Sequence, residues 1–162
     1  MATVNLSDYK PLNINNAEEF SIGIVFSEWN SFVTHNLRDA ALEILEKEGV
    51  KKDNISVYEV PGAFELSYAA MQLCKSKRYD AVIAIGCVIR GETLHFEYVC
   101  SAVAQGIKDC NILTDTPAVF CVLTDDNKEQ SIARSGGNLG NKGVEAAVTA
   151  LQMIDFKKCL KQ

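Results

Sequence analysis

Short apolar runs alternate with longer amphipathic segments along most of this chain. Four of the runs have the aliphatic and β-branched character of buried strands: residues 21–26, 55–60, 81–89 and 118–124. Each run is followed by a segment with apolar residues at helical spacing. Strands that alternate with helices indicate right-handed βαβ crossovers and a parallel sheet between two helix layers. We therefore predict an α/β, three-layer sandwich in which helices flank both faces of a four-stranded parallel sheet, as in flavodoxin-like folds.

The helical segments have recognisable boundaries. The first carries Val33, Leu37, Ala41 and Ile44 and stops at Gly49. We expect the second to open at Pro61 and the third to begin at about Leu94. A short helix is predicted near residues 127–135, with Asp126 and Glu129 as its capping pair, and the last helix from about Lys142.

The length suits one domain preceded by an arm. A chain of 162 residues and 17.8 kDa is long enough to bury its own core. Residues 1–20 are polar and weakly patterned, so we interpret them as an N-terminal arm or edge segment. Residues 21–162 are predicted to form a single α/β domain.

Charge and hydropathy exclude several classes of partner. The formal net charge is −5 and no long basic run is present, which argues against nucleic-acid binding. The apolar runs are shorter than the ~20 residues that cross a bilayer, and the N-terminus lacks a signal-peptide pattern. We expect a soluble, cytoplasmic protein with no membrane partner.

Six cysteines raise the alternatives of disulfides or a zinc site. However, no pair has C-x-x-C spacing, and most of the cysteines lie inside apolar runs. We therefore expect buried free thiols in a reducing compartment, and no metal site.

Ligands of parallel sheets bind beyond the carboxyl ends of the strands, so the residues there are the candidates for function. Trp29 follows the first strand, where it either caps the core or faces a ligand. Gly62, Ala63, Phe64 and Glu65 follow the second strand. Trp29 and Phe64 could bracket a planar heterocycle, although Glu65 taken alone would be a solvated acid of a first helical turn.

The segment VIRGETLHFEYVC follows the third strand. Gly91, Glu92 and Thr93 precede a helix, whose first N–H groups favour an anion. His95 lies close enough to exchange protons with a ligand there. Thr93 could instead be a plain N-cap, and His95 a partly buried polar residue. The other histidine, His35, is assigned to a structural position in a helix.

Two cations follow the fourth strand. Arg134 and Lys142 lie near glycines in the segment TDDNKEQSIARSGGNLGNKG. Such residues are usually solvated charges, but here they could complete the anion site.

Four segments together make the chain resemble the 6,7-dimethyl-8-ribityllumazine synthase family: FSEWNSF, VPGAFEL, GCVIRGETLHFEYV and FCVLTDDNKEQSIARSGGNLGNKG. The resemblance implies condensation of 5-amino-6-ribitylaminouracil with 3,4-dihydroxy-2-butanone 4-phosphate, releasing phosphate and water, in riboflavin biosynthesis. It also implies that no cofactor takes part.

The resemblance implies a role for each site residue. His95 and Arg134 would be catalytic, and the phosphate would be bound by Gly91, Glu92, Thr93 and Arg134. Phe120, Arg134 and Lys142 would come from a neighbouring subunit. The pyrimidine and its ribityl chain would be held by Trp29, Asn30, Gly62, Ala63, Phe64, Glu65, Val88, Ile89, Phe120 and Lys142.

The resemblance further implies a homo-oligomer with active sites at subunit interfaces, and an N-terminal arm of residues 1–20 that contacts a neighbouring subunit. A pentamer is the expected minimum, while a decamer, a 60-subunit shell and a partnership with riboflavin synthase stay open. Two alternatives remain: a non-catalytic module that binds a flavin or phosphorylated ligand, and a shell protein with only a structural role. A flavodoxin-type phosphate loop would be glycine-rich, and SEWNSF contains no glycine, which disfavours the binding module.

Overall fold

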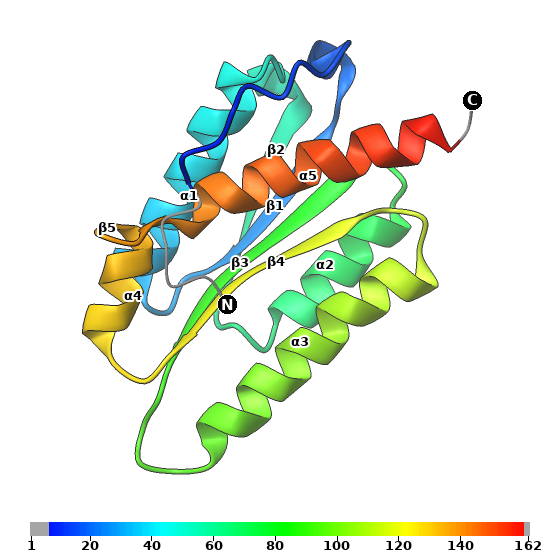
Figure 1. The fold of residues 1–162 in the computed structure, drawn as a ribbon. Coiled ribbons are helices and arrows are strands. Elements are labelled where there is room, and N and C mark those ends of the chain that lie inside the picture. The colour runs from blue at the N-terminus through cyan, green and yellow to red at the C-terminus, as the bar shows by residue number, and fades with distance from the viewer. Residues whose placement is uncertain (1–6, 161–162) are drawn as a thin grey trace.

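The computed structural model describes residues 7–160, which fold into a four-stranded parallel sheet between two helix layers (Figure 1). The strand order is β2-β1-β3-β4, with every neighbouring pair parallel. The predicted α/β sandwich is therefore confirmed. Its strands are β1 (Ile22–Ser27), β2 (Ile55–Val60), β3 (Ala81–Ile89) and β4 (Ala118–Asp125).

Each face of the sheet is covered by two long helices (Figure 1). One face carries α1 (Ser31–Lys47) and α5 (Lys142–Cys159), and the other α2 (Leu66–Lys75) and α3 (His95–Leu113). No helix within the described residues is long and apolar enough to span a membrane. The shorter helices are α4 (Lys128–Arg134) and the 3₁₀ turns η1 (Ala17–Glu19) and η2 (Lys52–Asn54).

The central strands β1 and β3 are apolar at nearly every position because both of their faces are buried, and Ser27 is the buried polar exception. In β1, Ile22, Ile24 and Phe26 pack towards α1 and α5, whereas Val25 packs towards α2 and α3. All six residues of β1 are buried. By contrast, β2 lies at an edge of the sheet, and all six of its residues are exposed or half-buried.

The second helix begins later than expected. α2 starts at Leu66, so the prediction that Pro61 opens it is wrong. The Pro61 carbonyl instead accepts a hydrogen bond of 3.0 Å from the backbone N–H of Trp29, and a turn separates it from the helix. Pro61 thus belongs to the connection between two strand ends.

The capping pair of α4 is displaced by one residue from the predicted pair. Asn127, not Asp126, is the N-cap, and its side chain accepts a 2.9 Å hydrogen bond from the backbone N–H of Gln130. The Gln130 side chain accepts in return from the N–H of Asp126, at 3.0 Å. The predicted Asp126 and Glu129 pair is therefore wrong, since Asn127 and Gln130 make the reciprocal bonds.

A small hairpin that the hydrophobic pattern did not predict joins α4 to α5. Its strands are β5 (Ser135–Gly137) and β6 (Gly140–Asn141), which pair antiparallel. Asn141 then caps α5, because its side chain accepts a 2.8 Å hydrogen bond from the N–H of Gly143.

The described part of the arm packs on its own chain. Tyr9 donates a 2.9 Å hydrogen bond to Glu48 of the segment after α1, and Tyr9, Leu12 and Ile14 pack against the core under α1 and α5. Residues 1–6 of the predicted arm lie outside the described residues. Contact between the arm and a neighbouring subunit stays a prediction.

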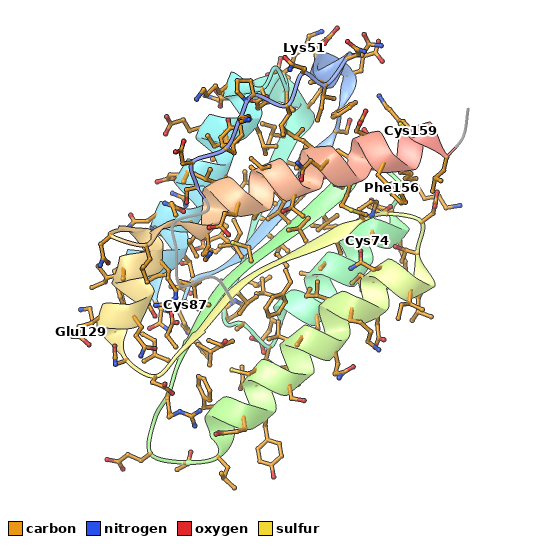
Figure 2. The ribbon with its side chains drawn as sticks, in the orientation of Figure 1. Lys51, Cys74, Cys87, Glu129, Phe156 and Cys159 are labelled. Carbon is orange, nitrogen blue, oxygen red and sulfur yellow. The ribbon has the colours of Figure 1, made fainter. Side chains whose placement is uncertain are left out.

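All six cysteines are free thiols. Cys74, Cys87, Cys110 and Cys121 are buried, whereas Cys100 is half-buried and Cys159 is exposed near the end of α5 (Figure 2). The expectation of buried free thiols thus holds for four of the six.

The close approach of α5 to α1 depends on Gly143. A Cβ atom at this position would lie 1.9 Å from the Leu37 carbonyl oxygen, which belongs to α1. We predict that Gly143→Ala lowers the free energy of unfolding by about 1–3 kcal/mol, because the backbones must separate. Urea unfolding measures this change. As a control, Gly91→Ala should leave the midpoint unchanged, since its Cβ would meet no described heavy atom within 4 Å. Equal midpoints for Gly143→Ala and the unmodified protein would contradict this account.

Candidate active site

Hydrogen bonds beyond the strand ends bring three connecting segments together. The backbone N–H groups of Glu28 and Trp29 donate to the carbonyls of Val60 and Pro61, at 2.8 and 3.0 Å. The Asn30 side-chain amide donates to the carbonyl of Cys87 on β3, at 2.9 Å. The segment after β1 is therefore tied to β2 on one side and to β3 on the other.

Gly62 provides the space that the Trp29 ring occupies. A Cβ atom at Gly62 would lie 2.7 Å from Cε3 of Trp29, so a larger residue would displace the ring. The N–H of Gly62 also donates a 3.1 Å hydrogen bond to the Glu65 carboxylate, which orients that side chain. Because Trp29 is 64% exposed, its ring faces outward and does not cap the core.

These segments surround a cavity of about 480 Å³, which we call the strand-end cavity. It brings together eight of the site residues predicted from the sequence, and it adds Cys87 and Val99. The positions of these two residues, at the end of a strand and four residues after His95, were the available sequence signals. The lining consists of Trp29, Asn30, Ala63, Phe64, Glu65, Cys87, Val88, Ile89, His95 and Val99.

The loop of Gly91, Glu92 and Thr93 is exposed between two residues of that lining, Ile89 and His95. The Thr93 hydroxyl accepts a long hydrogen bond of 3.4 Å from the backbone N–H of His95. The N-cap of α3 is Leu94, so the alternative that Thr93 is a plain N-cap is wrong, and its hydroxyl makes only this local bond. His95 itself is exposed.

Arg90 ties this loop to the elements on either side. Its Nε donates to the Asp126 carboxylate at 2.8 Å, and its Nη1 pairs with Glu97 on α3. The guanidinium also lies 4.2 Å from the centre of the Phe96 ring. The hydrogen bond from Arg90 lowers the pKa of Glu97. Arg90 was missed from the sequence because its partners lie on two different elements.

Phe120, Arg134 and Lys142 line a second cavity, of about 440 Å³, along β4 and α5. We call it the edge-strand cavity, because β4 is the outer strand on that side. The Lys142 ammonium lies 2.8 Å from both carboxylate oxygens of Glu145, and Nε of Arg134 lies 3.9 Å from the Asp125 carboxylate. Each cation of this cavity thus has an acidic partner from its own chain.

Within one chain, the predicted site is therefore divided. The aromatic platforms and His95 lie at the strand-end cavity, whereas Arg134 and Lys142 lie at the edge-strand cavity. The first can accept a planar ring, and the second presents donors for an anion. Asp125 and Glu145 were not predicted as partners of these cations, because nothing in the spacing of the sequence distinguishes them from other acids and an acid in a first helical turn is usually a solvated charge.

The Cys87 thiol is a weak nucleophile, and His35 lies outside the lining of both cavities. Burial raises the pKa of the Cys87 thiol to about 11, so it stays protonated near neutral pH and is a weak nucleophile. His35 packs edge-on against Phe26, with ring centres 5.6 Å apart, as expected of a structural position. Within the part of the chain that the structure describes, no three His, Cys, Asp or Glu side chains gather to hold a metal ion.

A family model described as 6,7-dimethyl-8-ribityllumazine synthase matches residues 19–158. Proteins with that same name include one from Parabacteroides distasonis, which is 51% identical over 96% of this chain and 99% of its own length. One from Flavobacterium johnsoniae is 53% identical over 95% of this chain and 81% of its own length. One from Phocaeicola vulgatus is 48% identical over the whole chain and 98% of its own length.

Thiol alkylation tests the state of Cys87. At pH 8 we expect iodoacetamide to modify the exposed Cys159 first and to leave Cys87 unmodified, because the thiolate is the reactive form and burial disfavours it. Peptide mass spectrometry of the native protein measures this order. Denatured protein, in which every thiol is accessible, serves as the control. Modification of Cys87 as fast as Cys159 would contradict the assignment.

Proposed function

The chain belongs to the 6,7-dimethyl-8-ribityllumazine synthase family, and we propose that it forms lumazine where its strand-end cavity meets the edge-strand cavity of a neighbouring copy. It is a transferase of riboflavin biosynthesis. The observation that carries the proposed site is that one cavity gathers residues at or just beyond the ends of three strands, Trp29, Phe64 and Ile89 among them, together with His95.

The reaction joins two substrates and releases three small molecules. The 5-amino group of 5-amino-6-ribitylaminouracil attacks the ketone of 3,4-dihydroxy-2-butanone 4-phosphate, and loss of water gives an imine. Inorganic phosphate is then eliminated, and attack by the ribitylamino nitrogen closes the second ring with loss of another water. Each step moves protons, so side chains that can donate and accept protons accelerate it.

We assign the pyrimidine to the strand-end cavity. Trp29 offers an exposed ring for stacking, in a position that Gly62 permits. Val88 and Ile89 supply an apolar wall, and the segment from Ala63 to Glu65 offers backbone groups and a carboxylate for the ribityl chain. The mixture of flat apolar surface and a few polar groups is typical of small-molecule sites.

We assign the phosphate to Gly91, Glu92 and Thr93 together with Arg134 of the neighbouring copy. The loop lies just before α3, where the helix dipole favours an anion. Arg134 contributes a guanidinium that can bind phosphate through two hydrogen bonds. The same neighbouring copy also supplies Phe120 and Lys142, because these two residues line one cavity with Arg134. The division of the site within one chain supports this contribution in trans.

His95 has the role of proton carrier. It lines the cavity at the first residue of α3, beside the phosphate loop, and its ring is exposed to a ligand there. Much of the acceleration comes from holding both substrates in register, and the cations stabilise the departing phosphate.

A homo-oligomer of at least five subunits completes this proposal, with a decamer and a 60-subunit shell as larger arrangements. Native mass measurement distinguishes them. The six free thiols suit a reducing compartment such as the cytoplasm. Riboflavin synthase, which would consume the product, is the proposed partner in the pathway.

Product formation tests the function directly. The purified protein is mixed with both substrates, and the fluorescence of the lumazine is followed over time. Formation above the uncatalysed rate supports the enzyme. If the rate does not rise above that background, a ligand-binding module or a purely structural shell protein becomes the better description.

The two catalytic residues should differ in importance. We predict that Arg134→Ala lowers kcat/KM by about 10²–10³-fold, the usual effect of removing a donor to a developing anion. His95→Ala should have a smaller effect, because solvent or substrate groups can partly replace a proton carrier. Steady-state kinetics of the two variants check this order. Equal losses in the two variants would argue against it.

Sharing of the site between subunits predicts complementation. A Trp29→Ala subunit and an Arg134→Ala subunit each lack a different half of the site, so their mixed oligomers contain some complete sites. We expect activity to rise above that of either variant when the two are dissociated and reassembled together. Each variant reassembled alone is the control. If mixing restores no activity although mixed oligomers form, both halves come from one chain.

A further inference from the structure

Asp125 is a buried acid to which the proposed reaction gives no role. It is the last residue of β4 and is 6% exposed, yet it belongs to the lining of the edge-strand cavity. An ionised side chain in such a place is costly unless it is paired and hydrogen-bonded. Its partners therefore indicate its role.

One carboxylate oxygen of Asp125 is anchored in the protein interior. The Ser131 hydroxyl donates to Oδ2 at 2.8 Å, and Ser131 is fully buried. The Cys87 thiol in turn donates to the Ser131 oxygen, at 3.5 Å. Because Cys87 lies on β3 and Ser131 on α4, these contacts hold the carboxylate between two elements.

The other oxygen faces Arg134. Oδ1 of Asp125 lies 3.9 Å from Nε of Arg134, and Nη1 of Arg134 donates a 2.9 Å hydrogen bond to the carbonyl of Gln130. The guanidinium has five N–H donors, so the two contacts orient it and leave Nη2 available for a ligand. The Arg134 side chain is 25% exposed, which leaves it accessible from the cavity.

We infer that Asp125, anchored by Ser131, is a positioning residue that holds the Arg134 guanidinium in the orientation that binds the substrate phosphate. This inference rests on the proposed function, since it takes Arg134 as a phosphate ligand. A guanidinium oriented before binding loses less side-chain entropy on binding, and this strengthens the interaction.

The direction in which phosphate affinity changes when the Asp125 charge is removed distinguishes a positioning role from a merely structural ion pair. A negative charge beside an anion site repels phosphate, so loss of that charge alone would tighten phosphate binding. Loss of orientation would weaken it. A positioning role and a merely structural ion pair therefore predict opposite changes for the same variant.

The test is Asp125→Asn, which removes the charge and keeps the shape and a hydrogen-bonding partner for Ser131. The probe is inorganic phosphate, titrated calorimetrically into the assembled protein. We expect its Kd to rise about tenfold, the factor that corresponds to 1.4 kcal/mol. The KM for the butanone phosphate should rise in parallel, whereas the KM for the pyrimidine should stay within about twofold.

Two further variants sharpen this result. Ser131→Ala removes the anchor and leaves both charges, so it should weaken phosphate binding in the same direction but by less. Asp39→Asn is the matched control. It removes an exposed acid that pairs with Arg38 at 2.7 Å on α1, outside the lining of the edge-strand cavity. It should leave both KM values and phosphate binding unchanged. Thermal unfolding of each variant confirms that it is folded, and Ser131→Ala decides the matter if Asp125→Asn does not fold.

The outcomes separate this inference from the proposed function. If Arg134→Ala does not weaken phosphate binding, the proposed phosphate site itself fails. If Arg134→Ala weakens it but the folded Asp125→Asn and Ser131→Ala variants bind phosphate unchanged or more tightly, only the positioning role is overturned.

Discussion

The parallel register of the sheet is the constraint on which the rest of the site depends. Ile22 of β1 pairs with Ile55 of β2 and with Ala81 of β3, so the three strands run in step towards the same edge. The segments that follow them must then leave the sheet side by side. Backbone bonds from the segment after β1, and the bond from Asn30 to β3, continue this pairing beyond the strands. A cavity with an aromatic lining is the consequence.

The same topology places the predicted site residues of one chain at two cavities. β4 is an edge strand, and Phe120 on it is 43% exposed, so its outer side is open to contact. The cations Arg134 and Lys142 face a cavity along that strand, each beside a carboxylate of its own chain. Under the proposed function, cations held in this way form a prepared anion site for a neighbouring copy, at the cost of burying Asp125.

The strands were predicted well from their hydrophobic pattern, and the starts of the helices less well. The central strands β1 and β3 were recognisable because burial on both faces favours apolar residues along their length. The cap of α4 was misplaced by one residue because Asp126, Asn127 and Glu129 are all plausible capping residues, and only backbone geometry selects Asn127 and Gln130. The short hairpin after α4 has no hydrophobic pattern from which it could be predicted.

The sequence by itself determined the alternation of strands and helices, the parallel sheet, and the chemical types at the strand ends, since these follow from local patterns of burial and polarity. The family also followed from motifs in the chain. Only the tertiary structure decided that Trp29 rests against Gly62, that Arg90 links two elements, and that Asp125 joins Ser131 to Arg134. The reason is physical: each of these contacts joins side chains that come from different segments or carry no distinctive spacing, and packing alone brings them within reach.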